Sequence, residues 1–466
     1  MVSINIFNMI AKGVSMKALL ENSQNDNNFT LKEAINEAKR CLNCSKPLCR
    51  IGCPIENEIP AFIKELANGN IGQASAVIAR HSNLPAVCGR VCAHEKQCEG
   101  SCVLSKTGTG IKIGKLERFI ADLDADLEIT PLPKNSNTKG NVAIIGSGPA
   151  GLTVAGDLAK LGFAITVFDA QAEPGGVLMY GIPAFRLCKD VVRREIQKIQ
   201  RLGVTFKNNV LIGRDLSLDQ LFNQGFDAIF IGTGNSISRR LDIEGSNLTG
   251  ILQAKYLLQI VALANQHSVG QEEIPIVKGD TVIVIGAGNV AMDAARTALR
   301  IGAASVTVLH REAANDVPAL KAEYEAAKQE GVNFLPAVTP LRFMGTNKVL
   351  GLQYSSLSTE PSINQQQRTF INADKIIIAI GQKPSNQIIS TTPGIEVTPD
   401  GFVKTKDRPY GMSTKHGVFS GGDVVHGPAT VVLAMKEAKK VATGIVQYVE
   451  AKKLMEECGL KIEKDL

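Results

Sequence analysis

The feature that most constrains the fold is a pattern of strand, glycine turn, helix and strand that occurs twice. It spans 141–169 (NVAIIGSGPAGLTVAGDLAKLGFAITVFD) and 281–311 (TVIVIGAGNVAMDAARTALRIGAASVTVLHR), and the first glycines of the two turns are Gly146 and Gly286. Short β-branched runs that alternate with helical periods are typical of a parallel sheet with helices on its faces. The chain is therefore expected to be an α/β protein with two Rossmann-like dinucleotide-binding domains.

The first glycine turn directly follows a predicted buried strand and opens a helix. Glycine is needed there because the turn is tight, the backbone approaches a pyrophosphate and the helix packs closely on its strand. Asp169 stands at the end of the second strand of this unit, where a carboxylate accepts hydrogen bonds from a ribose diol. We expect a dinucleotide here; a purely structural glycine turn is the alternative. The turn residues predicted to contact it are Gly146, Gly148, Pro149, Ala150 and Gly151.

The second turn has alanine in the third glycine position, and its unit ends on His310 and Arg311 instead of an acid. A carboxylate at that end would repel a 2′-phosphate, whereas Arg311 can pair with one, so NADP(H) is favoured over NAD(H). Glu312 follows directly and weakens this preference, and Arg311 as an exposed charge at a strand end is the alternative. The residues predicted to contact this nucleotide are Gly286, Gly288, Asn289, Val290, Ala291, His310 and Arg311.

A third motif, GVFSGGD at 417–423, is predicted to be a strand that ends on Gly-Gly-Asp, with a helix from about Ala429. The aspartate can hydrogen-bond to a ribityl hydroxyl, and a helix N-terminus aimed at a flavin ring stabilises negative charge on it. Asp423 as an ordinary turn residue is the alternative. The residues expected beside a flavin are Gly422, Asp423, Ala429 and Thr430.

Two predicted closing strands, 227–234 and 374–381, bracket the second nucleotide unit. This order predicts an NAD(P)H-binding domain at 276–372, inserted into an FAD-binding domain that is made of 140–275 and 373–466. The stretch 130–140, TPLPKNSNTKG, has the composition of a linker. It is expected to separate these domains from a domain at 1–135.

Eight of the ten cysteines lie between Cys41 and Cys102, in the spacings CxxCxxxxCxxxCP and CxxxCxxxxxCxxxC. No export signal is recognised, so a disulfide framework is the weaker interpretation and metal ligation the stronger. The other two, Cys188 and Cys458, lie far from each other along the chain, which disfavours a dithiol reductase. Spacings of this kind resemble iron–sulfur ligation. A flavin without another electron outlet favours it over zinc, the main rival.

The cysteine domain is expected to be helical. Thr30 and Glu33 form a capping-box pattern for a helix that delivers Cys41, and 60–80 is predicted to form two short helices broken at Gly69. The net charge is +6, 51 minus 45, with no basic run, which argues against nucleic acid as a partner. No apolar stretch is long enough to span a membrane, so a cytoplasmic location is expected.

From about Thr30 onward the chain resembles the small (beta) subunit family of NADPH-dependent glutamate synthase. The same module is similar to the NADPH-side half of dihydropyrimidine dehydrogenase and to the large subunit of the bifurcating ferredoxin:NADP oxidoreductase. The motifs that carry the resemblance are AKRCLNCSKPLCRIGCP, LPAVCGRVCAHEKQCEGSCVL, IGKLERF, IIGSGPAGL, EPGGVLMYGIPAFRL, VIGAGNVAMDAARTALR and GVFSGGDVVHGPATVVLAM.

The resemblance implies two [4Fe-4S] clusters and further cofactor contacts. One cluster is implied on Cys41, Cys44, Cys49 and Glu117, and the other on Cys53, Cys92, Cys98 and Cys102. Whether Cys88 replaces one of these ligands stays open. The resemblance also places Arg296 near the NADP site, and it places Gly175 and Gly176 in a turn over the flavin, for which a simple turn is the alternative.

The expected activity is that of an FAD-dependent NAD(P)H oxidoreductase. NADPH would give hydride to the flavin N5, and single electrons would pass through the clusters to a partner subunit with FMN or iron–sulfur centres, the glutamate synthase large subunit or an equivalent. No side chain is needed as an acid or base, because the protein positions and tunes the cofactors. The alternatives are the nicotinamide-side subunit of a bifurcating or pyrimidine-reducing complex, and a non-catalytic scaffold that binds zinc.

Overall fold

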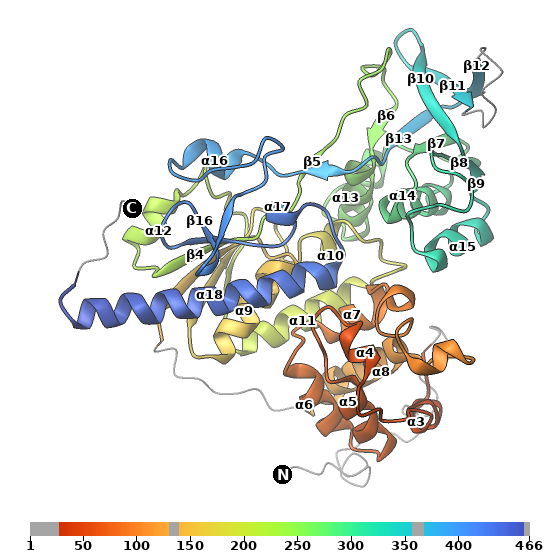
Figure 1. Cartoon of the computed structure of the whole chain (residues 1–466). Coiled ribbons are helices and arrows are strands. Elements are labelled where there is room, and N and C mark those ends of the chain that lie inside the picture. The colour runs from red at the N-terminus through yellow and green to blue at the C-terminus, as the bar shows by residue number, and fades with distance from the viewer. Residues whose placement is uncertain (1–27, 130–138, 357–367, 461–466) are drawn as a thin grey trace, which may run out of the picture. The chain divides into compact units, whose positions relative to one another are not determined.

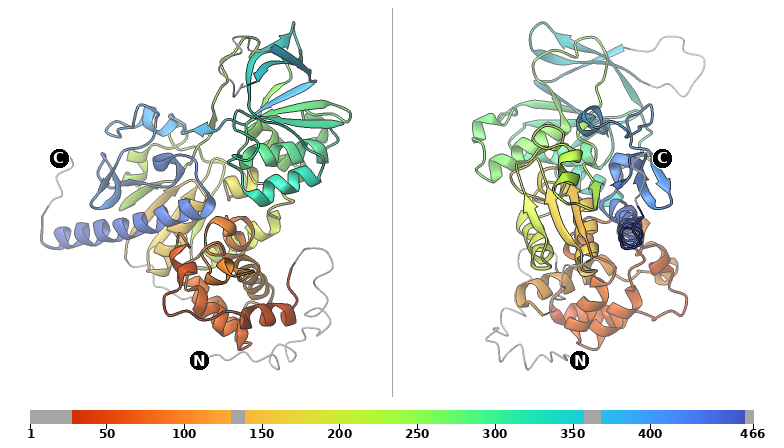
Figure 2. Two further views of the ribbon diagram at one scale, coloured as in Figure 1. Left: turned by 45° about the vertical axis from the view of Figure 1, so that its right-hand side comes forward. Right: turned by 90° about the vertical axis from the view of Figure 1, so that its left-hand side faces the viewer.

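The computed structural model describes residues 28–129, 139–356 and 368–460, and these form two compact units. Figure 1 labels their elements and Figure 2 gives two further views. The N-terminal residues in which no export signal is recognised, and most of the predicted linker, lie outside the described residues. The first unit comprises Met1–Leu178, Arg186–Asn235 and Pro384–Leu466, and the second comprises Met179–Phe185 and Ser236–Lys383.

The first unit begins with the helical cysteine segment. The predicted capping box is present, because the Glu33 N–H donates to Thr30 Oγ1 and the Thr30 N–H donates to the Glu33 carboxylate. Gly69 separates the two predicted short helices at a φ of +78°, which glycine adopts without strain. The helices are α3 (Leu31–Lys39), α4 (Leu48–Ile51), α5 (Ile59–Ala67), α6 (Ile71–Ala79), α7 (Pro85–Val91), η1 (His94–Lys96), η2 (Val103–Lys106) and α8 (Ile113–Leu127).

A seven-stranded sheet forms the rest of the first unit, in the order β15-β16-β17-β4-β1-β2-β3. The five strands from β17 to β3 are parallel, and the valines and isoleucines of these strands are buried because helices cover the sheet. The strands are β1 (Asn141–Ile145), β2 (Ala164–Phe168), β3 (Thr205–Lys207), β4 (Ala228–Ile231), β15 (Thr405–Asp407), β16 (Tyr410–Ser413) and β17 (Val418–Ser420).

The helices that accompany this sheet include the long C-terminal helix α18, which packs against α9 (Figure 1). They are α9 (Pro149–Lys160), α10 (Val177–Tyr180), α11 (Lys189–Arg201), α12 (Leu218–Asn223), α16 (Gln387–Thr391), α17 (Asp423–His426) and α18 (Val431–Glu457). The described helices include none with the length and apolar character that a bilayer crossing requires.

The second unit is built on a five-stranded parallel sheet in the order β6-β13-β7-β8-β9, with an antiparallel sheet β10-β11-β12 and a short ribbon β14-β5. The strands are β5 (Ile237–Ser238), β6 (Ile251–Gln253), β7 (Thr281–Ile285), β8 (Ser305–Leu309), β9 (Asn333–Leu335), β10 (Val338–Gly345), β11 (Val349–Ser356), β12 (Arg368–Asn372), β13 (Lys375–Ile378) and β14 (Gln382–Lys383). The helices are α13 (Ala254–Asn265), η3 (Gln271–Glu273), α14 (Asn289–Arg300) and α15 (Lys321–Gln329).

The inserted unit is larger than the expected 276–372. The strands β6 and β13 pair within its sheet, and Leu257 of α13 shares a core with Val282 and Met292. The insertion therefore begins at Ser236 and ends at Lys383. A strand as short as β6 has no periodicity from which its sheet could be predicted. The described helices of the expected domain at 1–135 belong to the same compact unit as the first sheet.

Candidate cofactor sites

The glycine turn between β1 and α9 has room for a ligand at one glycine and none at the other two. Gly146 has a φ of +95°, and a Cβ on it would lie 2.7 Å from the Gly232 carbonyl oxygen. A Cβ on Gly151 would overlap the carbonyl oxygen of Gly146. A Cβ on Gly148 would meet nothing within 4 Å, and no side chain caps the N–H groups of α9 that begin there. This open helix N-terminus fits a pyrophosphate.

Asp169 and the turn at Gly175 are tied to this glycine turn through Ser147. The Asp169 Oδ2 accepts hydrogen bonds from Ser147 Oγ and from the Ser147 N–H at 2.8 Å. Ser147 Oγ in turn accepts from the Gly175 N–H at 2.8 Å, and a Cβ on Gly176 would lie 2.8 Å from the Gly148 Cα. The structure thus brings the predicted residues together. Ser147 was not predicted; its hydroxyl between two glycines of the fingerprint is the only sequence signal for it.

The C-terminal motif meets the same turn because β17 lies beside β4, next to β1. A Cβ on Gly422 would lie 2.9 Å from the Ala150 Cβ. Asp423 begins the short helix α17, and burial raises the pKa of its carboxyl to about 6 although the Ala429 backbone donates to it. The long helix begins at Val431, slightly later than the predicted start at Ala429.

The N-terminus of α18 has hydrogen-bonding groups that lack a partner. Thr430 is the N-cap residue, but its side chain makes no capping hydrogen bond, and its buried Oγ1 has no partner within the described parts of the chain. A buried hydroxyl without a partner costs free energy, so such a group points to a ligand that supplies one. Together with the open turn at Gly148, this arrangement fits FAD.

The glycine turn of the second unit has the same open geometry. Gly286 has a φ of +125°, and a Cβ on Gly288 would meet nothing within 4 Å. Ala291, in the third glycine position, is fully buried. The Asn289 side chain is already engaged, because its Oδ1 accepts from the Leu320 N–H at 2.9 Å, whereas Val290 is exposed. The contacts of these residues with a nucleotide stay predictions.

The residues after β8 place one exposed cation beside a carboxylate. Arg311 is 83% exposed at its side chain, and its Nε donates to Glu312 Oε1 at 3.2 Å. His310 is buried, and burial lowers the pKa of its imidazole. Neither of its ring nitrogens has a hydrogen-bond partner in the described chain. At the end of β8, Arg311 is therefore the positively charged side chain that can pair with a phosphate. To do so it must give up its hydrogen bond to Glu312.

Arg296, which the resemblance places near the NADP site, contacts carboxylates and an aromatic ring within the second unit. Its guanidinium donates to Glu330 Oε1 from Nε at 3.0 Å and from Nη2 at 2.8 Å, and to Glu323 Oε2 at 2.8 Å. It also lies over the Phe185 ring, 4.5 Å from the centroid. Two carboxylates already neutralise its charge, so nothing in these contacts supports a role in binding a phosphate.

The cysteines fall into two groups, but not the two that the resemblance implies. Cys102 lines a cavity together with Cys41, Cys44 and Cys49, whereas Glu117 does not line it. Apolar side chains such as Ile63 form the other walls. The resemblance implies Glu117 in this group, but the residues that line the cavity include Cys102 and not Glu117. The reason is that η2 and the segment before it fold back onto the loop at Cys41.

Glu117 lies with the other three cysteines. Burial is the main cause that raises the pKa of Cys53, to about 11, and it also raises the pKa of Cys98. The negative charge of the Glu117 carboxylate raises the pKa of both thiols further. Glu117 acts on Cys92 in the same direction. Burial also raises the pKa of Glu117 itself to about 8. Four acidic side chains that repel one another as anions fit a positively charged group such as ligated iron.

The first ligand group surrounds a hollow. No three His, Cys, Asp or Glu side chains, in the ranges that the structure covers, converge on a position for one metal ion. A four-iron cluster is a cage in which each iron takes its own ligand, so its ligands stand apart around it. The mostly apolar cavity between Cys41 and Cys102 has this form.

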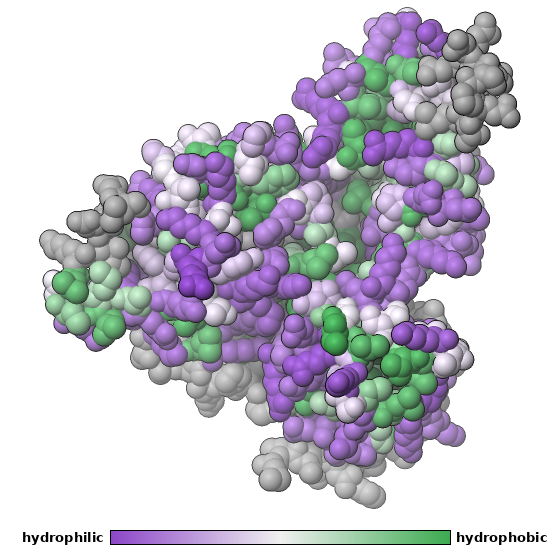
Figure 3. Space-filling model, viewed as in Figure 1, coloured by the Kyte–Doolittle hydropathy of each residue, from purple (hydrophilic) through white to green (hydrophobic). Residues whose placement is uncertain are grey.

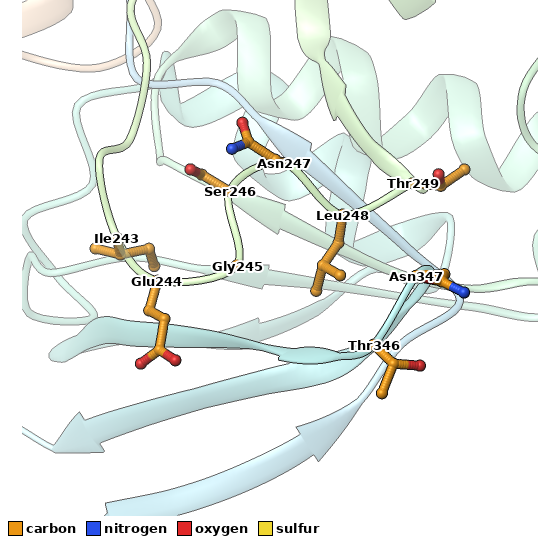
Figure 4. A pocket seen from close by; sticks show the side chains of 9 residues that line it. All are labelled: Ile243, Glu244, Gly245, Ser246, Asn247, Leu248, Thr249, Thr346 and Asn347. Atoms are coloured by element: carbon orange, nitrogen blue, oxygen red, sulfur yellow. The ribbon is translucent and has the colours of Figure 1, made fainter.

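An open cavity in the second unit contains none of the predicted site residues. It lies between the 243–249 segment and the turn at 346–347, and its lining side chains do not converge on one point (Figure 4). Its one titratable side chain, Glu244, pairs with Arg342 at 2.8 Å. We assign no ligand to this cavity.

Comparisons with known proteins match the two parts of the chain to two families. A family described as dihydropyrimidine dehydrogenase domain II, 4Fe-4S cluster, matches residues 20–129, and the pyridine nucleotide-disulphide oxidoreductase family matches 140–438. The glutamate synthase [NADPH] small chain of Halomonas elongata is 37% identical over 90% of this chain and 91% of its own length. The subunit PreT of an NAD-dependent dihydropyrimidine dehydrogenase from Escherichia coli K12 is 34% identical over 91% and 96%.

Solved structures share the fold. FprA of Mycobacterium tuberculosis, in a complex with NADPH, has a TM-score of 0.55 at 18% identity and covers 70% of this chain and 87% of its own. Thioredoxin reductase of T. acidophilum has a TM-score of 0.50 at 18% identity, with 66% and 97% covered. The identity and coverage of the curated relatives decide the family. The chain belongs to the glutamate synthase [NADPH] small chain family, within the pyridine nucleotide-disulphide oxidoreductases.

Proposed function

We propose that this protein is an FAD-dependent NAD(P)H oxidoreductase that passes electrons through iron–sulfur clusters to a partner subunit, as the small chain of a glutamate synthase. One observation carries the proposal. A single compact unit holds the open glycine turn at Gly148 and both groups of candidate ligands. The two cysteines outside the helical segment, Cys188 and Cys458, are both exposed at helix ends, so they offer no dithiol beside the turn.

The chain's own residues bind and orient the cofactors. FAD, when bound, exchanges two electrons with a nicotinamide and single electrons with clusters. Gly148 leaves space for the pyrophosphate, Ser147 fixes Asp169 and the Gly175 turn, and the positive end of α18 stabilises negative charge near Thr430. No titratable side chain is needed to move a proton, because rates depend on positioning and potentials.

Two [4Fe-4S] clusters are part of the proposal, with ligands grouped as the structure brings them together. The first would be held by Cys41, Cys44, Cys49 and Cys102, and the second by Cys53, Cys92, Cys98 and Glu117. A carboxylate is a harder donor than a thiolate, so Glu117 would give the second cluster a different potential.

A large-subunit partner is implied by the small-chain relatives, and we propose that it contains FMN or iron–sulfur centres. Leu42 and Ile51, near the first ligand group, are 62% and 74% exposed. Apolar residues gather on this face of the helical segment (Figure 3). Such a surface is suited to contact with a partner protein, and electrons would leave there.

Reduced cysteines fit a reducing compartment, and we propose the cytoplasm.

The proposal is tested on protein purified without oxygen. We expect about eight irons, about eight acid-labile sulfides and one FAD per chain, as two [4Fe-4S] clusters and one flavin require. NADPH should bleach the flavin and cluster absorbance. Zinc in place of iron, or a flavin that no reduced nicotinamide can reduce, would refute the electron-transfer function and favour the scaffold.

Nucleotide preference is the next prediction. Arg311→Ala should raise KM for NADPH at least about tenfold, the loss of a charged hydrogen bond, and should leave KM for NADH nearly unchanged. Steady-state reduction of an artificial acceptor measures both. Arg342→Ala is the matched control, since Arg342 is an exposed arginine of the same unit paired with Glu244. Equal effects of Arg311→Ala on both nucleotides would remove the phosphate-binding role.

A second candidate function is that of an NADH-linked subunit of a pyrimidine-reducing complex. The observation that favours it is the ion pair between Glu312 and Arg311, because the Glu312 carboxylate takes the place of a 2′-phosphate beside the arginine. The same kinetic measurement decides between the two. A lower KM for NADH than for NADPH in the unaltered protein would favour this candidate.

A further inference from the structure

The two segments that supply cysteines to the cavity of the first ligand group carry charge of one sign. Residues 39–52 (KRCLNCSKPLCRIG) and 102–112 (CVLSKTGTGIK) contain six basic residues and no Asp or Glu, although the whole chain has 51 basic and 45 acidic residues. Cys49 of the first segment and Cys102 of the second both line the cavity. The six basic residues are Lys39, Arg40, Lys46, Arg50, Lys106 and Lys112.

Most of these basic residues are exposed and make no ion pair. All except Arg50 are exposed, and Arg50 is half-buried. Arg40 pairs with Glu37 at 2.7 Å, and the other five make no ion pair within the described parts of the chain. Glu37 is the nearest acid in the sequence, and its carboxylate also accepts the Lys112 N–H at 2.9 Å. The unpaired charges can therefore attract an acidic group over a Debye length, about 10 Å at 0.1 M salt.

The two basic segments meet beside the cavity. The Arg40 guanidinium donates to the Thr109 carbonyl oxygen at 2.6 Å, which joins the end of α3 to the loop after η2. Lys46 lies two residues before Leu48, which lines the cavity. Lys106 is the last residue of η2, and the first two residues of η2 line the cavity as well. Basic residues thus accompany the exposed apolar side chains on this face of the helical segment.

The segments of the second ligand group have the opposite charge. Residues 53–58 and 92–99 contain four acids and one basic residue, which are Glu56, Glu58, Glu95, Glu99 and Lys96. A four-iron cluster held by thiolates carries negative charge, and the second group binds three of them. If the basic residues only offset the charge of a cluster, the second group would need them as well. Their excess at the first group alone therefore points to an acidic partner outside the chain.

We propose that this basic and apolar face binds an acidic face of a redox protein, whose own centre takes electrons from the cluster on Cys41, Cys44, Cys49 and Cys102. In each transfer the cluster is oxidised by one electron and the centre of the partner is reduced by one. This inference rests on the proposed function, since it requires that cluster, and it adds the charge of the partner. Complementary charges steer the two proteins together, and the exposed apolar side chains provide the contact.

The test compares two small one-electron acceptors of opposite charge, an acidic rubredoxin and the basic cytochrome c. The full-length protein with its cofactors is reduced with NADPH, and the second-order rate of acceptor reduction is measured from about 10 mM to about 300 mM salt. We expect the rubredoxin rate to fall at least about tenfold as salt rises, because salt screens the attraction. The cytochrome c rate should rise, because salt screens the repulsion.

Charge reversal locates the effect on the surface. In Lys46→Glu combined with Lys106→Glu we expect the rubredoxin rate at low salt to fall about tenfold and the cytochrome c rate to rise. Iron, FAD and the bleaching of the flavin by NADPH should stay the same. Lys278→Glu combined with Lys348→Glu is the matched control, at two exposed lysines of the second unit. Each reversal removes two charges, so both pairs lower the net charge from +6 to +2.

Three results would overturn the proposal. The same salt dependence with both acceptors would show no selection by charge, and equal effects of the two pairs would assign the selection to net charge. A shifted cluster midpoint with unchanged salt dependence would make the basic residues part of the cluster's environment only. Should the Glu pair lose iron, Lys46→Gln combined with Lys106→Gln decides, and an unchanged rubredoxin rate contradicts the proposal. Failure of the proposed function is distinguishable, because NADPH would then reduce neither flavin nor clusters in the unaltered protein.

Discussion

Removal of Cys92 will cost the protein one cluster and its electron delivery. In Cys92→Ala we expect iron to fall from about eight to about four atoms per chain, the content of one [4Fe-4S] cluster. FAD should remain, because the glycine turn at Gly148 shares no residue with the ligand group. NADPH should still bleach the flavin, whereas electron transfer to the partner subunit should stop. Iron, sulfide and FAD analysis with stopped-flow spectra measures this. Cys188→Ala, at an exposed cysteine, is the control and should change none of these.

A double variant decides how the ligands are grouped. In the structure Cys102 lies with Cys41, so Cys92→Ala combined with Cys102→Ala should remove both clusters. Under the grouping that the resemblance implies, Cys92 and Cys102 hold the same cluster, and the double variant would keep about four irons. Cys41→Ala combined with Cys102→Ala gives the reverse pattern, with about four irons retained under the structural grouping. An iron content that follows the other pattern would contradict the grouping described here.

The second large effect distinguishes Gly148, which leaves space for the cofactor, from Gly151, which allows the helix to pack on the turn. A Cβ on Gly148 meets nothing in the protein, so Gly148→Ala should fold normally but exclude the FAD pyrophosphate. Overpacking of about 1–3 kcal/mol should then weaken FAD binding by a factor between about 5 and about 150. In Gly151→Ala the new Cβ meets backbone, which cannot move away cheaply, so the loss should appear in the stability of the fold itself.

Thermal unfolding of the two variants, with and without added FAD, together with FAD titration of the FAD-free protein, tests this pair. Gly148→Ala should lose most of the stabilisation that FAD gives, while the FAD-free midpoint stays the same. Gly151→Ala should unfold at a lower temperature in both states. The control is Gly108→Ala in the helical segment, where a Cβ also meets nothing within 4 Å, and it should change neither quantity. A lower FAD-free midpoint in Gly148→Ala would contradict an open site.

Interactions between residues a few positions apart made much of the fold predictable. The capping box joins Thr30 to Glu33 within one helical turn, and the break at Gly69 depends on one backbone angle. The glycine turns and the β-branched strands around them are also local, because a tight turn and a buried strand each restrict which residues fit. The sequence therefore predicted two nucleotide units and the helical cysteine segment.

The tertiary structure decided the contacts between segments that are distant in the sequence. Local spacing cannot show that Cys102 folds back beside Cys41, or that Glu117 of α8 faces Cys53 and Cys92. It cannot show that carboxylates of α15 and the residue after it neutralise Arg296, or that β6 extends the inserted unit to Ser236. These arrangements depend on how whole helices and strands pack. The sequence determined which residue types can hold the cofactors, and long-range packing determined which of them stand together.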